Sequence, residues 1–113
     1  MDKDKLIILW TSGDIEVAQN MVFMYTINAK KNQWWKDITF IIWGPSAKLL
    51  SDNDKLQVQI KEFIDHDINV EACKACADRY NVSDTLAELG VDVKYMGEPL
   101  TEYIKSNKKV ITF

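Results

Sequence analysis

The fold is decided by a stretch near the start of the chain, Leu6-Ile7-Ile8-Leu9-Trp10-Thr11-Ser12-Gly13-Asp14. A continuous apolar run passes directly into a group of turn-forming residues, which is typical of a strand buried on both faces that then turns into a helix. Ser12 or Asp14 can cap this helix, because their side-chain oxygens can accept hydrogen bonds from its first N–H groups.

Similar apolar runs recur along the chain, separated by longer segments with helical spacing. A parallel sheet with crossover helices produces this alternation. We therefore predict a three-layer α/β/α sandwich with a mainly parallel five-stranded sheet, flavodoxin-like in outline. Gly90 is expected to end one helix, and Pro99 to be the first residue of the last helix. The predicted strands are 5–10, 37–43, 69–73, 91–96 and 108–113, and the predicted helices are 14–31, 54–66, 74–80 with 83–89, and 99–106.

Composition places the chain among ordinary globular domains. It has 113 residues, of which 47% are hydrophobic and 27% charged, and we expect one domain over residues 1–113. The net charge of −3 and the scattered lysines argue against a nucleic-acid partner. We expect no membrane span, because no apolar run is long enough, and no secretory signal. Two cysteines so close together form a poor disulfide framework, so we expect a cytoplasmic protein.

The first predicted helix has an unusual surface. Residues 17–29 include no charged side chain, and their apolar residues point in several directions. A helix on the surface of a monomer normally has one apolar stripe and one polar face. Trp34 and Trp35 follow, in what should be an exposed connection. We therefore expect a helix buried on more than one side and a homo-oligomer, although the chain's own sheet and loops could also cover this helix.

The chemistry is concentrated in the segment Asn69-Val70-Glu71-Ala72-Cys73-Lys74-Ala75-Cys76. Cys73 is expected at the carboxyl end of the third strand, the edge at which open α/β sheets bind ligands. The following helix start and Lys74 are expected to lower the pKa of its thiol. Cys73 is thus a candidate nucleophile, predicted to be the more reactive cysteine. Cys76, one turn along the helix, could resolve an adduct on it.

Other interpretations of the two cysteines remain open. They could be inert buried residues, or a thioredoxin-like redox pair. A zinc site would need more ligands than Cys73, Cys76, His66 and nearby carboxylates provide in one chain, so no metal or cofactor is predicted. His66 is better explained as a residue that stabilises a helix end. Trp10 and Trp43, which end two strands, could be core residues or could wall an apolar pocket beside Cys73.

The chain resembles the DsrE/DsrF-like family of small α/β proteins that handle sulfur. Two stretches are the most specific. One is the second strand with its Gly-Pro turn and Leu-Leu helix, and the other is the cysteine segment. The opening strand and turn and the closing helix and strand are also similar. The four stretches are 6–14, 40–50, 73–82 and 97–113.

This resemblance implies a doubly covered parallel sheet, assembly into homo- or hetero-oligomers, and a cysteine that carries sulfur as a persulfide. Cys73 falls on the family's cysteine, whereas Cys76 belongs to the pattern of some members only. The function expected first is a cytoplasmic sulfur carrier or sulfurtransferase-like protein, with sulfur-donor and sulfur-acceptor proteins as partners. A thiol-disulfide redox protein that uses Cys73 and Cys76 is the alternative, followed by a non-catalytic oligomeric binding module.

Overall fold

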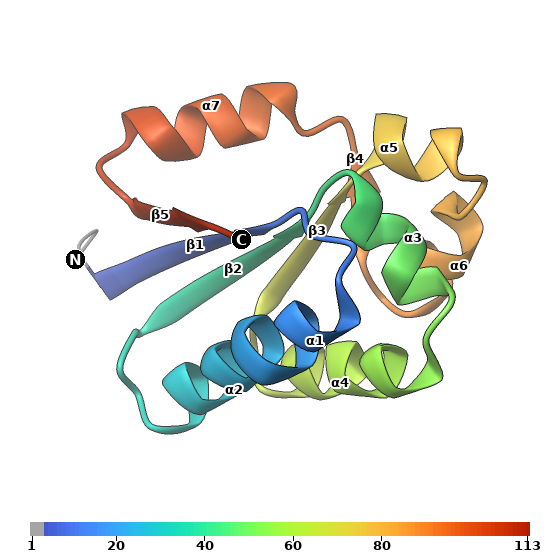
Figure 1. Cartoon of the computed structure of the whole chain (residues 1–113). Helices are drawn as coiled ribbons and strands as arrows, with labels where there is room; N and C mark the ends of the chain where they lie inside the picture. The colour runs from blue at the N-terminus through green and yellow to red at the C-terminus, as the bar shows by residue number, and fades with distance from the viewer. Residues whose placement is uncertain (1–3) are drawn as a thin grey trace.

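The computed structural model describes residues 4–113 as a five-stranded sheet between two layers of helices (Figure 1). The strand order is β4-β3-β2-β1-β5, and every neighbouring pair is parallel. The strands are β1 (Lys5–Trp10), β2 (Asp37–Ile42), β3 (Asn69–Cys73), β4 (Asp92–Lys94) and β5 (Lys109–Thr112). The helices are α1 (Ile15–Val17), η2 (Ala18–Val22), α2 (Phe23–Lys31), α3 (Pro45–Ser51), α4 (Asp54–Asp65), α5 (Lys74–Arg79), α6 (Ser83–Glu88) and α7 (Gly97–Lys105).

The strand order explains how the helices are divided between the two faces. From β1 to β4 the chain moves steadily toward one edge of the sheet, and β5 then returns to the far side of β1. Since parallel crossovers are right-handed, a reversal of direction places the connection on the opposite face. The connections from α1 to α6 therefore pack mainly on one face and α7 covers the other, with Cys76 of α5 reaching the edge of the cluster beneath α7 (Figure 1). The predicted three-layer parallel architecture is confirmed.

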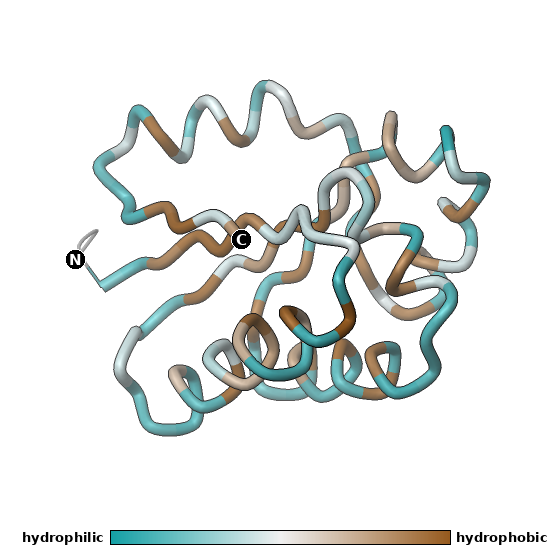
Figure 2. Tube along the Cα trace, in the orientation of Figure 1, coloured by the Kyte–Doolittle hydropathy of each residue, from teal (hydrophilic) through white to brown (hydrophobic). Residues whose placement is uncertain are grey.

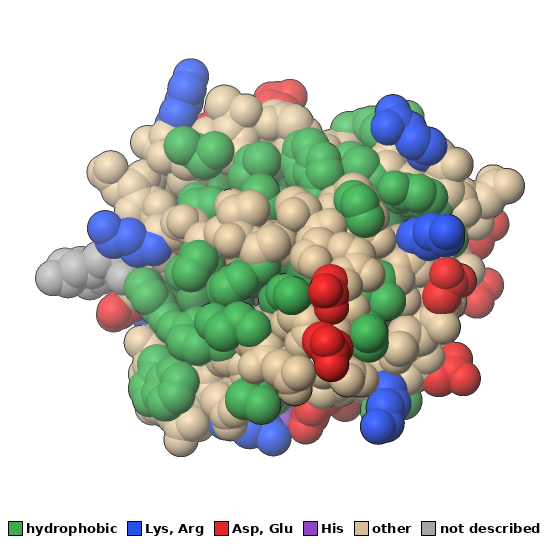
Figure 3. Space-filling view, in the orientation of Figure 1, with side chains coloured by type: hydrophobic (Ala, Val, Ile, Leu, Met, Phe, Trp, Pro, Cys, Tyr) green, Lys and Arg blue, Asp and Glu red, His purple; other side chains and the backbone are tan. Residues whose placement is uncertain are grey.

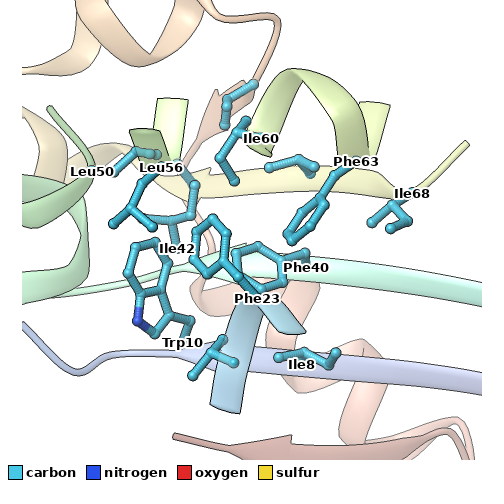
Figure 4. Close-up of a cluster of buried hydrophobic side chains, with 14 of the residues drawn as sticks. Ile8, Trp10, Phe23, Phe40, Ile42, Leu50, Leu56, Ile60, Phe63 and Ile68 are labelled. Atoms are coloured by element: carbon cyan, nitrogen blue, oxygen red, sulfur yellow. The ribbon is translucent and has the colours of Figure 1, made fainter. Parts of the chain in front are cut away.

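The larger core lies on the face covered by several helices. Its centre is a group of aromatic rings from β1, α2, β2 and α4, with centroids 4.9–5.7 Å apart along the chain of contacts (Figure 4). These rings are fully buried, so their removal from water is the main source of stability on this face. They belong to Trp10, Phe23, Phe40 and Phe63.

A smaller cluster lies between the sheet and α7. Ile7, Ile41, Cys73 and Met96 are its buried members, and half-buried side chains of α7 pack against it. Unlike α4, which buries three apolar residues, α7 has no fully buried residue. Figure 2 shows the same contrast, with hydrophobic residues along the central strands and a mixed pattern on α7. The α7 face is thus the more thinly packed of the two.

Most element boundaries agree with the sequence prediction, with informative differences. Asp14 caps the first helix as expected, because its side chain accepts from the N–H groups of Glu16 and Val17. That helix then passes through a turn of π-helix, η2, which the pattern did not indicate. Gly90 has the expected left-handed φ of 95°. The last helix begins at Gly97, so Pro99 is its third residue and not its first.

In the single chain the first helix is covered on one side only, so the alternative that the chain's own sheet and loops cover it fully is wrong. Its outward side chains are exposed, and Met24 and Trp34 reach 53% and 58% exposure. On the face shown in Figure 3, hydrophobic side chains gather over α2 and the β1–β5 edge of the sheet. The residues of this α2 surface are Val17, Met21, Met24 and Trp34.

Candidate functional site

The carboxyl ends of β3 and β4 form the point where the connections diverge. The connection from β3 runs to α5 and α6 on the large-core face, whereas β4 leads to α7 on the other face. In open α/β sheets such a switch point leaves a crevice where ligands bind. Cys73 is the last residue of β3 and pairs with Lys94, the last residue of β4. The strand order therefore places Cys73 at this switch point.

The Cys73 thiol is enclosed. The residue is only 5% exposed and belongs to the cluster beneath α7. Burial raises the pKa of the Cys73 thiol and the neighbouring Cys76 side chain adds to the increase, although the nearby N–H groups of Cys76 and Ala75 oppose it. The predicted lowering of this pKa is therefore wrong, because desolvation outweighs the start of the helix.

Cys76 occupies the outer side of the same cluster. It is half-buried, both cysteines are free thiols, and the two residues approach to 3.2 Å. This proximity is compatible with exchange of sulfur between the two side chains. Access in the closed fold favours Cys76 over Cys73, whereas the sequence predicted Cys73 as the more reactive thiol.

Lys74 does not act on the Cys73 thiol as the sequence suggested. Its Nζ forms an ion pair of 3.0 Å with Asp78 one turn further along α5, and lies 6.0 Å from the centroid of the Tyr95 ring. The hydrogen bond to Asp78 raises the pKa of Lys74. The amine is thus directed along the exposed side of the helix.

A buried carboxylate next to the thiol was not identified as functional from the sequence. Glu71 is 3% exposed and lies two residues before Cys73, on the same face of β3. Its Oε1 accepts a hydrogen bond of 2.7 Å from the Tyr103 hydroxyl, and its Oε2 accepts from Lys94 at 2.7 Å and Asn69 at 3.2 Å. A single charge within a short buried strand was the available signal, since such a group needs partners.

Two partners of Glu71, Lys94 and Tyr103, have raised pKa values. The hydrogen bond to Glu71 raises the pKa of Lys94, which also contacts Asp92 at 3.0 Å. Burial, followed by the hydrogen bond to Glu71, raises the pKa of Tyr103 to about 12. At neutral pH the group therefore contains a protonated Lys94 amine and a neutral Tyr103 hydroxyl. It joins β3, β4 and α7 beside Cys73.

The remaining candidate residues, Trp10, Trp43 and His66, do not lie together at one site. Trp43 packs against the Cys73 cluster, whereas Trp10 is fully buried in the core on the opposite face. Trp10 therefore does not line the thiol site, because successive residues of a strand point to opposite faces. His66 follows the last residue of α4, with its Nδ1 at 2.9 Å from the Glu62 carbonyl oxygen. Within residues 4–113, no three His, Cys, Asp or Glu side chains gather as they would around a metal ion.

The fold and the site define a small parallel α/β domain with two adjacent thiols at its switch point. The sequence profile of the DsrE/DsrF-like family matches residues 4–113, and the chain belongs to this family. No curated protein matches the chain. Among the helices of the described residues, none has the length and apolar character needed to cross a bilayer.

Two solved structures share this fold. A conserved protein of unknown function from Bacteroides thetaiotaomicron, BT1422, has 41% sequence identity and a TM-score of 0.94. The match covers 97% of this chain and 95% of that one. The ychN protein from E. coli has 18% identity and a TM-score of 0.70, with both chains covered completely. The latter likeness concerns the fold alone.

Proposed function

We propose that this protein is a cytoplasmic sulfur carrier that holds sulfur as a persulfide on Cys73 and passes it to a partner thiol. The observation that carries the proposal is the pair of free thiols, Cys73 and Cys76, at the switch point of a DsrE/DsrF-like domain. The proposal needs no metal or cofactor, because cysteine thiolates are sufficient nucleophiles for sulfur exchange.

The loading step balances without an external oxidant. The Cys73 thiolate attacks the outer sulfur of a donor persulfide, the S–S bond of the donor breaks, and the donor leaves as a thiolate. In delivery, a partner thiolate attacks the outer sulfur on Cys73, which leaves as a thiolate in turn. If Cys76 instead attacks the inner sulfur, hydrosulfide is released and a Cys73–Cys76 disulfide forms. Burial of Cys73 protects the persulfide from other thiols between loading and delivery.

Self-association is the second part of the proposal. The α2 surface exposes large apolar side chains without an intervening charge, and isolated monomers seldom leave such patches uncovered. A second copy of the chain is the occupant that we propose for it, and the other partners would be a sulfur donor and a sulfur acceptor.

One specific observation favours a second function. Because the two cysteines approach to 3.2 Å, they could cycle as a thiol-disulfide redox pair. A reversible intrachain disulfide with a potential in the biological range, in a protein that gains no sulfur from a persulfide donor, would support this alternative.

Intact-mass analysis after exposure to glutathione persulfide tests the main proposal. We expect the unmodified protein and Cys76→Ser to keep the mass of one sulfur atom after the donor is removed, and Cys73→Ser to keep none, because the accessible Cys76 would lose its sulfur to free thiols. Cys76→Ser is the matched control, because it removes a neighbouring thiol by the same substitution. Equal gains in the two variants, or no gain in any form, would contradict the assignment to Cys73.

A further inference from the structure

The segment between β4 and the end of α7 lies over Cys73 on one face of the sheet. Met96, Leu100 and Tyr103 close the small cluster in which the thiol is buried. All three belong to the connection that runs from β4 through α7, which we call the α7 cover and define as residues 96–105. A reagent or donor protein that approaches Cys73 from the α7 face must therefore displace part of the α7 cover.

The α7 cover is held less firmly than the helices on the other face. Its helix has no fully buried residue, and its Ile104 is 60% exposed. A hollow of about 250 Å³ lies beside Tyr103, lined mainly by polar residues at the amino ends of the strands. Segments with few buried apolar contacts open at lower free-energy cost than the core. The apolar contacts of α7 alone thus form a weak attachment.

One side-chain hydrogen bond reinforces this attachment. The Tyr103 hydroxyl donates to Oε1 of Glu71 at 2.7 Å, across 32 positions of sequence. Within residues 4–113, this is the side-chain hydrogen bond that joins α7 to the sheet. Glu71 cannot easily turn away, because its other oxygen is held by Lys94 and Asn69.

Opening the cover must break this bond in an almost dry site. Glu71 is 3% exposed in the closed fold, so its freed Oε1 lacks a partner until water reaches it, and a buried polar group without its partner is costly. The hydrogen bond therefore raises the free-energy cost of opening the α7 cover. Glu71 and Cys73 lie on the same face of β3, two residues apart, so the bond holds α7 over the strand that carries the thiol.

We infer that the Tyr103–Glu71 hydrogen bond is a latch that keeps the α7 cover closed over Cys73. Tyr103 and Glu71 are positioning residues here, since they act on access to the thiol and not on its chemistry. The inference deepens the proposed function by giving the buried carrier thiol a controlled entrance.

Native-state alkylation of Cys73 tests the latch without any sulfur chemistry. In a Cys76→Ser background, Cys73 is the remaining thiol, and its rate of reaction with iodoacetamide reports how often the cover opens. We expect Tyr103→Phe to raise this rate about tenfold, the effect of losing a hydrogen bond to a charged group. Tyr25→Phe is the matched control, because it removes a hydroxyl that accepts a 3.0 Å hydrogen bond from Trp35 on the opposite face.

An unchanged rate in Tyr103→Phe, or an equal rise in Tyr25→Phe, would overturn the latch. The urea dependence of the same reaction in the Cys76→Ser protein decides the matter even if Tyr103→Phe fails to fold. Opening of the cover alone exposes little surface, so the rate should rise only weakly with urea below the unfolding transition. A dependence as steep as that of global unfolding would contradict the inference.

These outcomes are independent of the proposed function. Gated alkylation of Cys73 with no gain of sulfur from a persulfide would refute only the sulfur-carrier proposal. Sulfur loading on Cys73 that Tyr103→Phe leaves unchanged, with unchanged alkylation, would refute only the latch.

Discussion

Cys73 and Cys76 approach to 3.2 Å, yet they differ sharply in their access to solvent. Cys73, the last residue of β3, is enclosed beneath the α7 cover, whereas Cys76 is half-buried on the first turn of α5. The two thiols therefore combine a protected position with an accessible one within a single short segment. This arrangement suits a carrier that must both hold a reactive sulfur and exchange it.

The difference in access predicts the order in which the thiols react. Cys76 should be alkylated by iodoacetamide before Cys73 at neutral pH, because Cys73 reacts only when the cover opens and its thiol has a raised pKa. The rate at Cys73 should continue to increase above pH ~8.5, where an ordinary thiol is half ionised. Peptide mapping after brief labelling measures both rates. Faster labelling of Cys73 in the folded protein would be inconsistent with its burial.

The ion pair between Lys94 and the buried Glu71 predicts that substituting the two residues lowers the free energy of unfolding by different amounts. Lys94→Met leaves the enclosed carboxylate of Glu71 without its cation and should lower the free energy of unfolding by about 3 kcal/mol. Glu71→Gln keeps an oxygen for Tyr103, and the 37% exposed Lys94 can still contact Asp92, so a loss of only about 1 kcal/mol is expected. Urea unfolding of both variants provides the comparison. A larger loss for Glu71→Gln would show that the carboxylate is not the dominant buried charge.

The pKa of Tyr103 predicts a stability change at high pH. A group whose folded pKa is raised contributes its full stability below the unfolded pKa, here about 10, and that contribution is lost as the pH rises through about 12. The unmodified protein should therefore lose stability over this range more steeply than Tyr103→Phe. Urea unfolding across the alkaline range tests the slope, and the ultraviolet absorbance of tyrosinate identifies the last tyrosine to ionise. Parallel pH profiles would rule out the effect.

The α2 surface predicts an oligomer in solution. Met24→Glu places a charge in the middle of this surface and should shift the assembly toward monomer without unfolding the chain, because the side chain points to solvent. Val58→Glu is the matched control, since Val58 is exposed on α4 outside the α2 surface. Light scattering at micromolar concentration gives the mass in each case. A monomeric unmodified protein would contradict the proposal.

Much of the fold could be predicted because its signals are local. The strands β1 and β3 have the predicted bounds, Asp14 caps the first helix, and Gly90 adopts the left-handed conformation expected after a helix. The position of Cys73 at the carboxyl end of β3 followed from the same pattern. Local patterns of this kind depend on a few neighbouring residues, so they survive tertiary packing.

The features that escaped prediction depend on long-range contacts. The raised pKa of Cys73 follows from the α7 cover, which is distant in the sequence and could not be placed without the strand order. The partners of Glu71 could not be identified from the sequence for the same reason, since Lys94 and Tyr103 lie 23 and 32 positions away. Trp10 is the last residue of β1, whereas Trp43 follows the last residue of the adjacent β2. The two side chains are thus one position out of step and lie on opposite faces of the sheet.

The central claim is that transferred sulfur resides on Cys73, and locating that sulfur tests it most directly. Lys74 lies between the two cysteines, so trypsin separates them into the peptides 62–74 and 75–79. After glutathione persulfide treatment and alkylation of the unmodified protein, the additional sulfur atom should be found on peptide 62–74. Sulfur confined to peptide 75–79, or absent from both peptides, would contradict the account.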